Sequence, residues 1–198
     1  GGTDFVPWYE EHGGAVLSTT MDKYCHIFVR RLPAFFEYKH RIVYSKIELV
    51  KNFSEIEHPS VRETMRFFKT NEGLEIHHDG DLPARSGLGS SSSFTVGLSH
   101  ALLALQGKIA DPKTLADIAI EIEQKQIGES CGSQDQVAAA YGGFNKILFH
   151  KNKEIEVKPI VIPPRNLNDL QKSLCLFFTG VSRHADQIEQ DKLKSLSQ

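Results

Sequence analysis

The sequence has few cysteines, no long apolar run and no excess of charge of either sign. Its three cysteines, Cys25, Cys131 and Cys175, are far apart and form no CxxC pair. This argues against a disulfide framework and favours a reducing compartment, the cytoplasm. No stretch of about eighteen apolar residues occurs, so we expect no membrane span, and no signal peptide is recognisable. A formal net charge of −2 provides no basic surface for nucleic acid or an anionic membrane.

The remaining composition is that of an ordinary globular protein. Hydrophobic residues make up 40% and charged residues 24% of the chain, as is usual for globular proteins. Its 198 residues are enough for one large domain or for a domain plus part of a second. The chain starts at Gly1-Gly2-Thr3-Asp4 without an initiator methionine, and residues 192–198 stop within an expected helix. We therefore expect a fragment trimmed at both ends.

Apolar periodicity predicts a mixture of helices and strands. Helices are expected over residues 7–12, 61–68, 90–105, 111–122 and 133–141 and after Ser182. Strands are expected over residues 15–20, 24–30, 41–50, 74–78, 146–150, 154–160 and 174–179. Three consecutive helices occur without a regular βαβ alternation. The order therefore predicts an α+β fold rather than a doubly wound parallel sheet.

The most informative stretch is a loop rich in glycine and serine that leads directly into a helix. Residues 81–95 read Asp-Leu-Pro-Ala-Arg-Ser-Gly-Leu-Gly-Ser-Ser-Ser-Ser-Phe-Thr, and a helical apolar pattern begins at Phe94. The unpaired N–H groups and the positive dipole end of a helix N-terminus bind anions. We predict that nucleotide phosphates lie here. A serine-rich linker, or a helix that is merely well capped, is the alternative.

This loop lacks the usual phosphate-binding motifs. No Gly-Lys-Ser/Thr follows its glycines, and Gly87-Leu88-Gly89 lacks the third glycine of a dinucleotide-binding fingerprint. Backbone N–H groups and serine hydroxyls would therefore hold the phosphates. A divalent cation such as Mg²⁺ would offset the charge, with one serine hydroxyl and one carboxylate as sufficient protein ligands.

Two carboxylates downstream of the loop are candidates for the cation and the catalysis. Glu123 follows the apolar stripe of one expected helix, and Asp135 lies at the start of the next, in Ser133-Gln134-Asp135-Gln136. Each has an ordinary structural interpretation, since acids are favoured in the first turn of a helix and on solvated helix faces. Their place beside a glycine-bracketed loop favours the functional interpretation.

Three other features carry weaker signals. His77-His78-Asp79 could suggest a metal site, but adjacent strand residues face opposite sides. Cys131 could be a nucleophile, but no histidine is near it in sequence, so an inert thiol is favoured. Arg183 follows an expected strand at a helix start, where it could bind an anionic substrate.

The segment Pro83-Ala84-Arg85-Ser86-Gly87-Leu88-Gly89-Ser90-Ser91 resembles the PxxxGLGSS motif of the GHMP kinases, which include galactokinase and the homoserine, mevalonate and phosphomevalonate kinases. Residues 1–5 resemble the end of the family's first motif. Residues 132–136 resemble the segment that holds the catalytic aspartate of its sugar kinases. The resemblance covers the whole chain and is greatest to the branch that acts on D-glycero-D-manno-heptose 7-phosphate, through residues 1–8, 41–48, 77–85 and 177–183.

The resemblance implies a fold and an activity. Residues 1–165 would form a GHMP kinase N-terminal domain, of the ribosomal protein S5 domain 2-like type, without its first strand. Residues 166–198 would begin a truncated, ferredoxin-like C-terminal domain. The implied reaction is ATP-dependent phosphorylation of the anomeric C1 hydroxyl of the heptose 7-phosphate, giving the 1,7-bisphosphate for GDP-heptose and surface polysaccharides. Another sugar such as fucose or galactose, a mevalonate-type alcohol, or a non-catalytic binding relative are the alternatives.

The resemblance also implies site residues. ATP would contact Pro83, Gly87, Leu88, Gly89, Ser90, Ser91 and Ser92. Ser91 and Glu123 would hold Mg²⁺, and Asp135 would accept or orient the proton of the sugar hydroxyl. The sugar would contact Gly2, Thr3, Asp4, Ser133, Gln134 and Arg183. The implied partners are therefore ATP and a sugar phosphate, with no nucleic acid and no membrane, and the oligomeric state is open. The arginine that precedes the glycines of the family's first motif is missing, as is the third glycine-rich motif.

Overall fold

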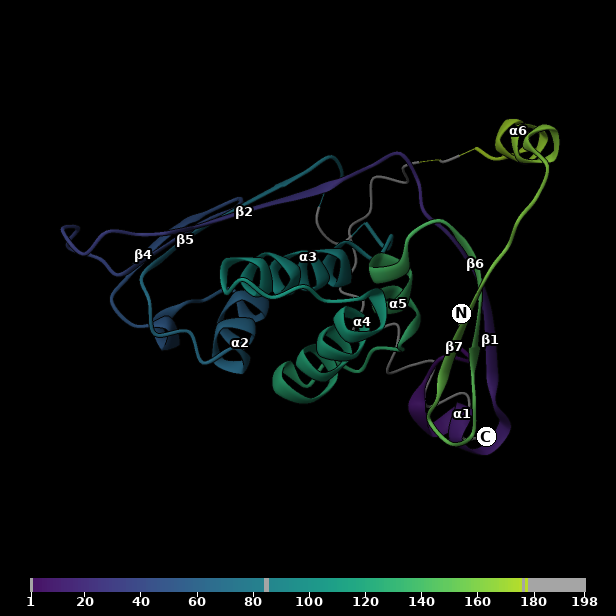
Figure 1. The fold of residues 1–198 in the computed structure, drawn as a ribbon, viewed down its shortest axis with the longest axis horizontal. Coiled ribbons are helices and arrows are strands. Elements are labelled where there is room, and N and C mark those ends of the chain that lie inside the picture. The colour runs from purple at the N-terminus through teal and green to yellow at the C-terminus, as the bar shows by residue number, and fades with distance from the viewer. Residues whose placement is uncertain (1, 84–85, 176, 178–198) are drawn as a thin grey trace.

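The computed structural model describes residues 2–83, 86–175 and 177. Two β-sheets lie on either side of a group of helices (Figure 1). The expected α+β architecture is therefore present. Among the described residues, no helix is long and apolar enough to cross a membrane.

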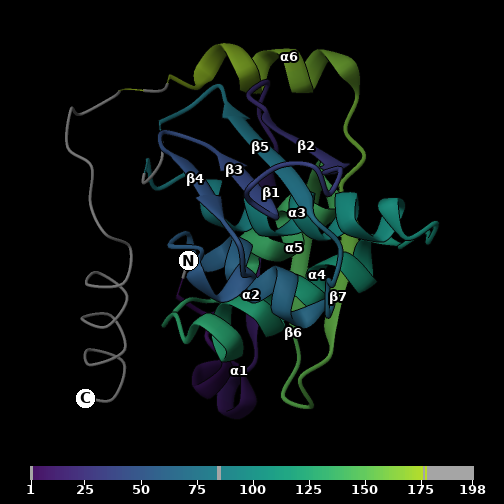
Figure 2. The same ribbon diagram turned by 90° about the vertical axis from the view of Figure 1, so that its left-hand side faces the viewer.

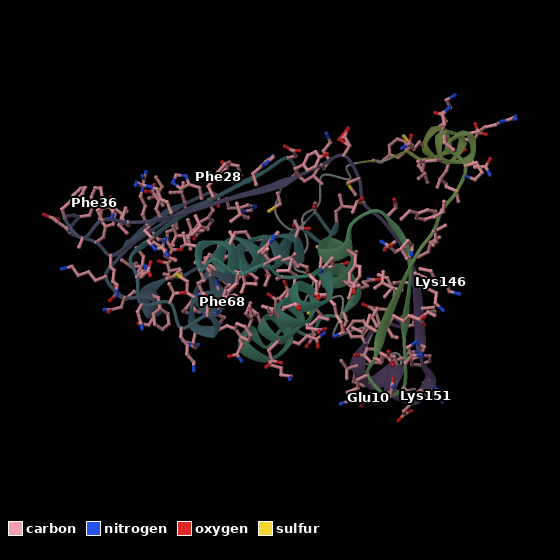
Figure 3. The ribbon with its side chains drawn as sticks, in the orientation of Figure 1. Glu10, Phe28, Phe36, Phe68, Lys146 and Lys151 are labelled. Atoms are coloured by element: carbon pink, nitrogen blue, oxygen red, sulfur yellow. The ribbon has the colours of Figure 1, made fainter. Side chains whose placement is uncertain are left out.

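The larger sheet has four strands in the order β2-β5-β3-β4, side by side in Figure 2. These are β2 (Cys25–Arg31), β5 (Leu74–Gly80), β3 (His40–Val43) and β4 (Ile47–Val50). β3 and β5 are parallel, and the other neighbours are antiparallel. Side chains alternate between the two faces of a strand, so Phe28 stands on the face away from the helices, 59% exposed (Figure 3).

Helices α2 (Pro59–Phe67) and α3 (Ser90–Leu105) cover the other face of this sheet (Figure 1). The main core lies between them and the strands, with Ile42 and Ile76 packed against Met65 and Leu98. Each of these four side chains is at most 1% exposed. Burial of such side chains stabilises the fold by roughly 1.5–3 kcal/mol each. This core fixes the start of α3, where the glycine–serine loop ends.

The single strand expected over residues 41–50 is wrong. The chain turns back between β3 and β4, and Val43 pairs with Ile47 across the hairpin. In the turn, the N–H of Tyr44 donates to the carbonyl of Lys46 at 2.9 Å. Alternation of apolar and polar residues continues through this turn, which explains why the sequence pattern did not reveal it. The short 3-10 helix Phe53–Glu55 follows.

The smaller sheet has three antiparallel strands in the order β1-β6-β7. They are β1 (Gly14–Thr19), β6 (Phe144–Phe149) and β7 (Ile155–Pro159). Helix α1 (Val6–His12) packs on this sheet, with the Tyr9 ring stacked on Phe149 at 5.4 Å between centroids. The N-terminal segment is thereby held next to the helices that follow the loop.

Helices α4 (Pro112–Ile120) and α5 (Gln134–Tyr141) lie between α3 and the smaller sheet (Figure 1). Asp111 caps α4, because its carboxylate accepts from the N–H of Thr114 at 2.7 Å. Beyond the expected stripe the chain continues as a π-helix, Glu121–Ile127 (η2), which ends at Gly128 with φ of 79°. Single π-helical turns are rare and occur frequently at functional sites.

Helix α6 (Pro164–Ser173) is not among the helices expected from the sequence. A proline in the first turn is compatible with a helix because its missing N–H would be unpaired there anyway. No residue of α6 is buried. The expected strand at 174–179 lies largely outside the described residues, and the helix after Ser182 lies wholly outside them.

Candidate active site

The glycine–serine loop ends in an open helix N-terminus. Gly87 and Gly89 have φ of +75° and +72°, a region that favours glycine. Gly89 is the N-cap of α3, and among the described residues no side chain caps this end. Leu88 and Ser91 are exposed, as is Pro83 at the start of the loop. The N–H groups of the first turn could therefore bind an anion, and the phosphate site stays a prediction.

Asp135 lies against this loop. It occupies the first turn of α5. A Cβ atom built on Gly89 would lie 3.4 Å from the Asp135 Cγ atom. The exposed Asp135 side chain therefore lies close beside Gly89, although 46 positions separate the two residues. This is the geometry that a base acting beside a bound phosphate would need.

Asp4 joins the N-terminal segment to the start of α5. Its side chain, 1% exposed, accepts from the N–H of Gly2 at 3.0 Å and from the N–H of Gln134 at 3.1 Å. The Ser133 N–H donates to the Asp4 carbonyl at 3.1 Å. A side chain at Gly132 would overlap the Asp4 carboxylate. Gly2, Asp4 and Gln134 are therefore brought next to Asp135.

Two residues predicted to contact the sugar have other partners. The Thr3 hydroxyl is tied to β1, since it donates to the Ala15 carbonyl and accepts from the Ala15 N–H. Ser133 is fully buried, and its hydroxyl accepts from the Gln124 amide at 3.1 Å. Both contacts give these side chains a structural role in holding the N-terminal segment and α5. Arg183 lies outside the described residues.

Glu123 projects from η2 into the space beneath the loop. It is 1% exposed, and its Oε2 atom accepts from the Ser92 hydroxyl at 2.8 Å and from the Gln136 amide at 2.5 Å. Burial raises the pKa of Glu123, the nearby Asp135 charge acts in the same direction, and the hydrogen bonds to the carboxylate oppose them. The structure thus brings Ser92 to Glu123, whereas Ser91 is exposed and its carbonyl accepts from the Thr95 hydroxyl at 3.2 Å.

The surroundings of Glu123 fit a hard divalent cation. Among the described residues, its Oε1 atom has no hydrogen-bond partner although it is buried. Such an oxygen is costly unless an ion or water lies beside it. Hydroxyl and carboxylate oxygens are the ligands that Mg²⁺ prefers. The Ser91–Glu123 pair predicted for Mg²⁺ stays a prediction, and Ser92 is an additional hydroxyl within reach.

Asp4, Ser92, Gln134 and Asp135 line one small pocket. Its walls are formed by Gly2, Asp4, Phe5, Ser92, Cys131, Gly132, Gln134, Asp135 and Gln136. Sequence reasoning missed Gln136 and gave Cys131 only an inert role. The adjacency of Gln136 to Asp135 was the one available signal. His77 and His78 are not brought together as a site, since His77 pairs with Glu75 and His78 packs on Phe94.

Comparison with known proteins agrees with this geometry. Residues 57–143 match the sequence model of the GHMP kinases N terminal domain. The D-glycero-alpha-D-manno-heptose 7-phosphate kinase of Campylobacter jejuni is 30% identical over 204 aligned residues, which cover 97% of this chain. Residues 57–143 therefore carry a GHMP kinase N-terminal domain, and the whole chain is similar to a heptose-phosphate kinase. It spans 59% of the length of that relative.

Two further GHMP kinase relatives extend the comparison. The crystal structure of a D-glycero-D-manno-heptose 1-phosphate kinase from Bacteroides thetaiotaomicron superposes with a TM-score of 0.80 at 26% identity, over the whole chain and 68% of that structure. The galactokinase of Pyrococcus furiosus is 31% identical over 126 residues, 64% of this chain and 34% of the relative. The GHMP kinase N-terminal fold is thereby confirmed.

Proposed function

We propose that the protein containing this chain transfers the γ-phosphoryl group of ATP to a hydroxyl of a sugar phosphate. The observation that carries the proposal is the position of Asp135 close beside Gly89, at the N-terminus of α3. In this proposal the helix N-terminus binds the phosphates and the neighbouring carboxylate acts as the base, and phosphoryl transfer requires mainly such positioning. The match to the GHMP kinase N-terminal domain and the similarity to a heptose-phosphate kinase support the same reaction class.

Each group in the proposed site has its own role in the transfer. The first-turn N–H groups of α3 and the hydroxyls of Ser90 and Ser91 bind the phosphates of ATP. Glu123 and a serine hydroxyl would hold Mg²⁺, which would neutralise phosphate charge. The sugar oxygen attacks the γ-phosphorus, the bond to the bridging oxygen breaks, and ADP leaves. Asp135 accepts the hydroxyl proton as the new bond forms. Its place at the N-terminus of α5 favours the charged, proton-free carboxylate.

The acceptor that we propose is D-glycero-D-manno-heptose 7-phosphate, phosphorylated at its C1 hydroxyl. Both the Campylobacter relative and the Bacteroides structure carry names of heptose-phosphate kinases. The buried Asp4 and the backbone of Gln134 form the wall where the sugar would bind. Such a product would serve GDP-heptose and surface polysaccharide synthesis in the cytoplasm.

Division of the chain near residue 165 is part of the same proposal. β7 ends at Pro159, and α6 begins at Pro164 with no buried residue. Figure 1 shows α6 separated from the helices that surround the pocket. We infer that residues 1–165 form the N-terminal domain and that residues 166–198 begin the second one.

One assay tests the acceptor. The full-length protein is incubated with ATP, Mg²⁺ and, separately, heptose 7-phosphate, heptose 1-phosphate, galactose, fucose or mevalonate, and ADP is followed. We expect ADP with heptose 7-phosphate and a new anomeric phosphate by phosphorus NMR. ADP with unphosphorylated sugars alone would refute the phosphate-bearing acceptor. Absence of ADP with every compound would favour a non-catalytic binding protein.

A further inference from the structure

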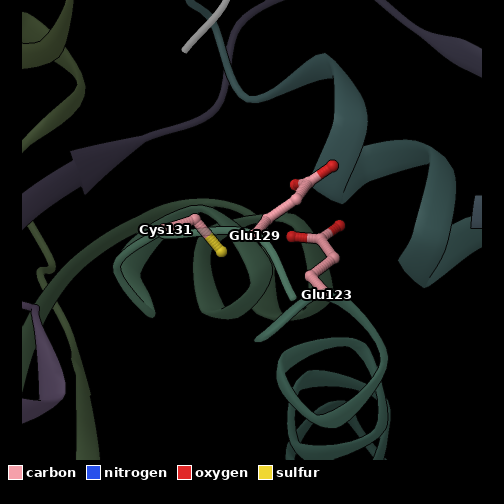
Figure 4. A group of neighbouring side chains, drawn as sticks. All are labelled: Glu123, Glu129 and Cys131. Carbon is pink, nitrogen blue, oxygen red and sulfur yellow. The ribbon is translucent and has the colours of Figure 1, made fainter. Parts of the chain in front are cut away.

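Glu123, Glu129 and Cys131 converge at the end of η2 (Figure 4). One carboxylate oxygen from each glutamate and the Cys131 sulfur all lie within 4.8 Å of one another. Glu123 is buried, and the other two side chains are half-buried. The proposed phosphoryl transfer uses neither Glu129 nor Cys131. Two oxygens and one sulfur in such proximity are the ligand types of a thiophilic divalent cation.

The backbone fixes the positions of these three residues. The Glu129 N–H donates to the Glu123 carbonyl at 2.9 Å, and the Cys131 N–H donates to the Glu129 carbonyl at 2.9 Å. The Gln124 amide donates to the Cys131 carbonyl at 3.1 Å. None of these bonds uses a side-chain ligand atom of the three residues. A cation would therefore find the loop already shaped, and little chain entropy would be lost on binding.

A second observation comes from two buried oxygens beside the cluster. Neither Glu123 Oε1 nor Gln136 Oε1 has a hydrogen-bond partner among the described residues, and both side chains are at most 1% exposed. The Gln136 amide lies at the cluster itself, since its Nε2 atom is 3.5 Å from the Cys131 sulfur and 2.5 Å from Glu123 Oε2. Buried polar atoms without partners are rare and mark places where an ion or water is missing.

We propose that Glu123, Glu129 and Cys131 bind Zn²⁺ or a cation of similar softness, and that this cation competes with Mg²⁺ for Glu123. Zn²⁺ binds cysteine sulfur at about 2.3 Å and carboxylate oxygen at about 2.0–2.2 Å, usually with four ligands. Three side chains leave one position for water. Binding displaces the Cys131 proton to solvent. Mg²⁺ does not use the sulfur because it prefers oxygen ligands.

The consequence for the enzyme is inhibition by a metal that is not the cofactor. Cys131 and Gln136 line the pocket that also contains Asp135, so an incoming cation reaches the cluster from the substrate side. Once Glu123 is held by Zn²⁺, it is lost to Mg²⁺. This consequence rests on the proposed kinase function, whereas cation binding at the cluster does not.

The decisive experiment measures binding in the full-length, reduced protein without ATP. Cd²⁺ is titrated while the sulfur-to-cadmium charge-transfer absorbance is recorded, and Zn²⁺ affinity is measured by equilibrium dialysis. We expect one Cd²⁺ per chain with this absorbance. Cys131→Ser should remove the absorbance, and Glu129→Gln should weaken Zn²⁺ binding at least about tenfold. The matched controls Cys175→Ser and Glu121→Gln, at an exposed cysteine and a surface ion pair, should bind like the wild type.

An absorbance that persists in Cys131→Ser, or Zn²⁺ affinity unchanged in both cluster variants, would overturn the site.

Inhibition is then tested with ATP, Mg²⁺ and rising Zn²⁺, and each variant is compared with its own rate without Zn²⁺. We expect Zn²⁺ to inhibit the wild type and Cys175→Ser at concentrations at least about tenfold lower than Cys131→Ser. Equal sensitivity would overturn the competition. Cd²⁺ binding in a protein without kinase activity would uphold the site and overturn the proposed function instead.

Discussion

The side-chain amide of Gln136 donates to the carboxylate of Glu123, with 2.5 Å between Nε2 and Oε2, and both side chains are buried. Gln136 directly follows Asp135 on α5, whereas Glu123 belongs to η2. One helical turn therefore carries the proposed base and also orients the proposed cation ligand. The hydrogen bond occupies one oxygen of Glu123 and leaves the other for the cation.

The first prediction concerns this orientation. Gln136→Leu should weaken the apparent Mg²⁺ affinity about 10–100-fold, the range for partners of metal ligands, while the KM for the sugar changes little. The change is read from turnover against Mg²⁺ concentration and from Mn²⁺ binding measured directly. Gln106→Leu at the end of α3, far from the pocket lining, is the matched control. If Gln136→Leu loses stability but binds Mn²⁺ normally, the residue only packs the core.

Asp135→Asn should lower kcat by about 10²–10⁴-fold, because a neutral amide cannot accept the hydroxyl proton. The substitution keeps the shape of the side chain, so ATP affinity should stay nearly unchanged. Single-turnover ADP formation and nucleotide binding are the two measurements. Asp117→Asn, at an exposed ion pair with Lys113 on α4, is the control and should leave the rate unaltered. Normal turnover by Asp135→Asn would show that another group takes the proton.

Local pattern was sufficient to predict the helix Ser90–Leu105 and the loop before it. The two glycines, the serine run and the apolar period from Phe94 onward specify a loop and a helix without any distant partner. The same reasoning could not place Asp4, because its contact with Gln134 joins residues 130 positions apart. That contact depends on the packing of α1 against the smaller sheet. Only the resemblance to the sugar kinases pointed to Asp4.

The errors have equally local causes. Tyr44 and Lys46 continue the alternation of a strand while they turn the chain, so the β3–β4 hairpin was read as one strand. The switch from α4 to η2 changes the helical period only slightly, and sequence periodicity does not resolve it. That switch decides where Glu123 points. The fold therefore decides that the Ser92 hydroxyl, and not that of Ser91, donates to Glu123.

Gly132 should tolerate no side chain while Asp4 is present. A Cβ at Gly132 overlaps the Asp4 carboxylate, and overpacking of this kind typically costs about 1–3 kcal/mol. We expect Gly132→Ala to lower the free energy of unfolding by at least that amount in urea titrations. In the Asp4→Ala background, Gly132→Ala should lower the free energy of unfolding by a smaller amount, because the Asp4 carboxylate that overlaps the added Cβ is absent. Additive effects of the two changes would contradict the contact.

Gly107→Ala provides the comparison for the Gly132 prediction. Gly107 has φ of +71°, and a Cβ added there would have no atom of the described residues within 4 Å. Alanine at this position would therefore strain the backbone but would not overlap a neighbour. Such strain costs about 1–2 kcal/mol, and it should be independent of Asp4. A Gly107→Ala cost that changed in the Asp4→Ala background would show that the double variant perturbs the whole fold, and the coupling to Gly132 would then carry no meaning.

The buried Glu123 carboxylate should make the protein less stable as pH rises, when no divalent cation is present. Burial raises its pKa in the folded state above the ordinary value of 4.5. Below that ordinary value the neutral acid favours the fold fully, and this contribution is lost as pH rises through the folded-state pKa.

Glu123→Gln removes the titration but keeps an acceptor for Ser92 and Gln136. In EDTA, its free energy of unfolding in urea should therefore exceed that of the wild type at pH 7.5, and the difference should vanish near pH 4. Added Mn²⁺ should stabilise the wild type and not the variant, because only the carboxylate binds the ion. A variant less stable than the wild type at pH 7.5 in EDTA would show that the charged carboxylate is already satisfied within the fold.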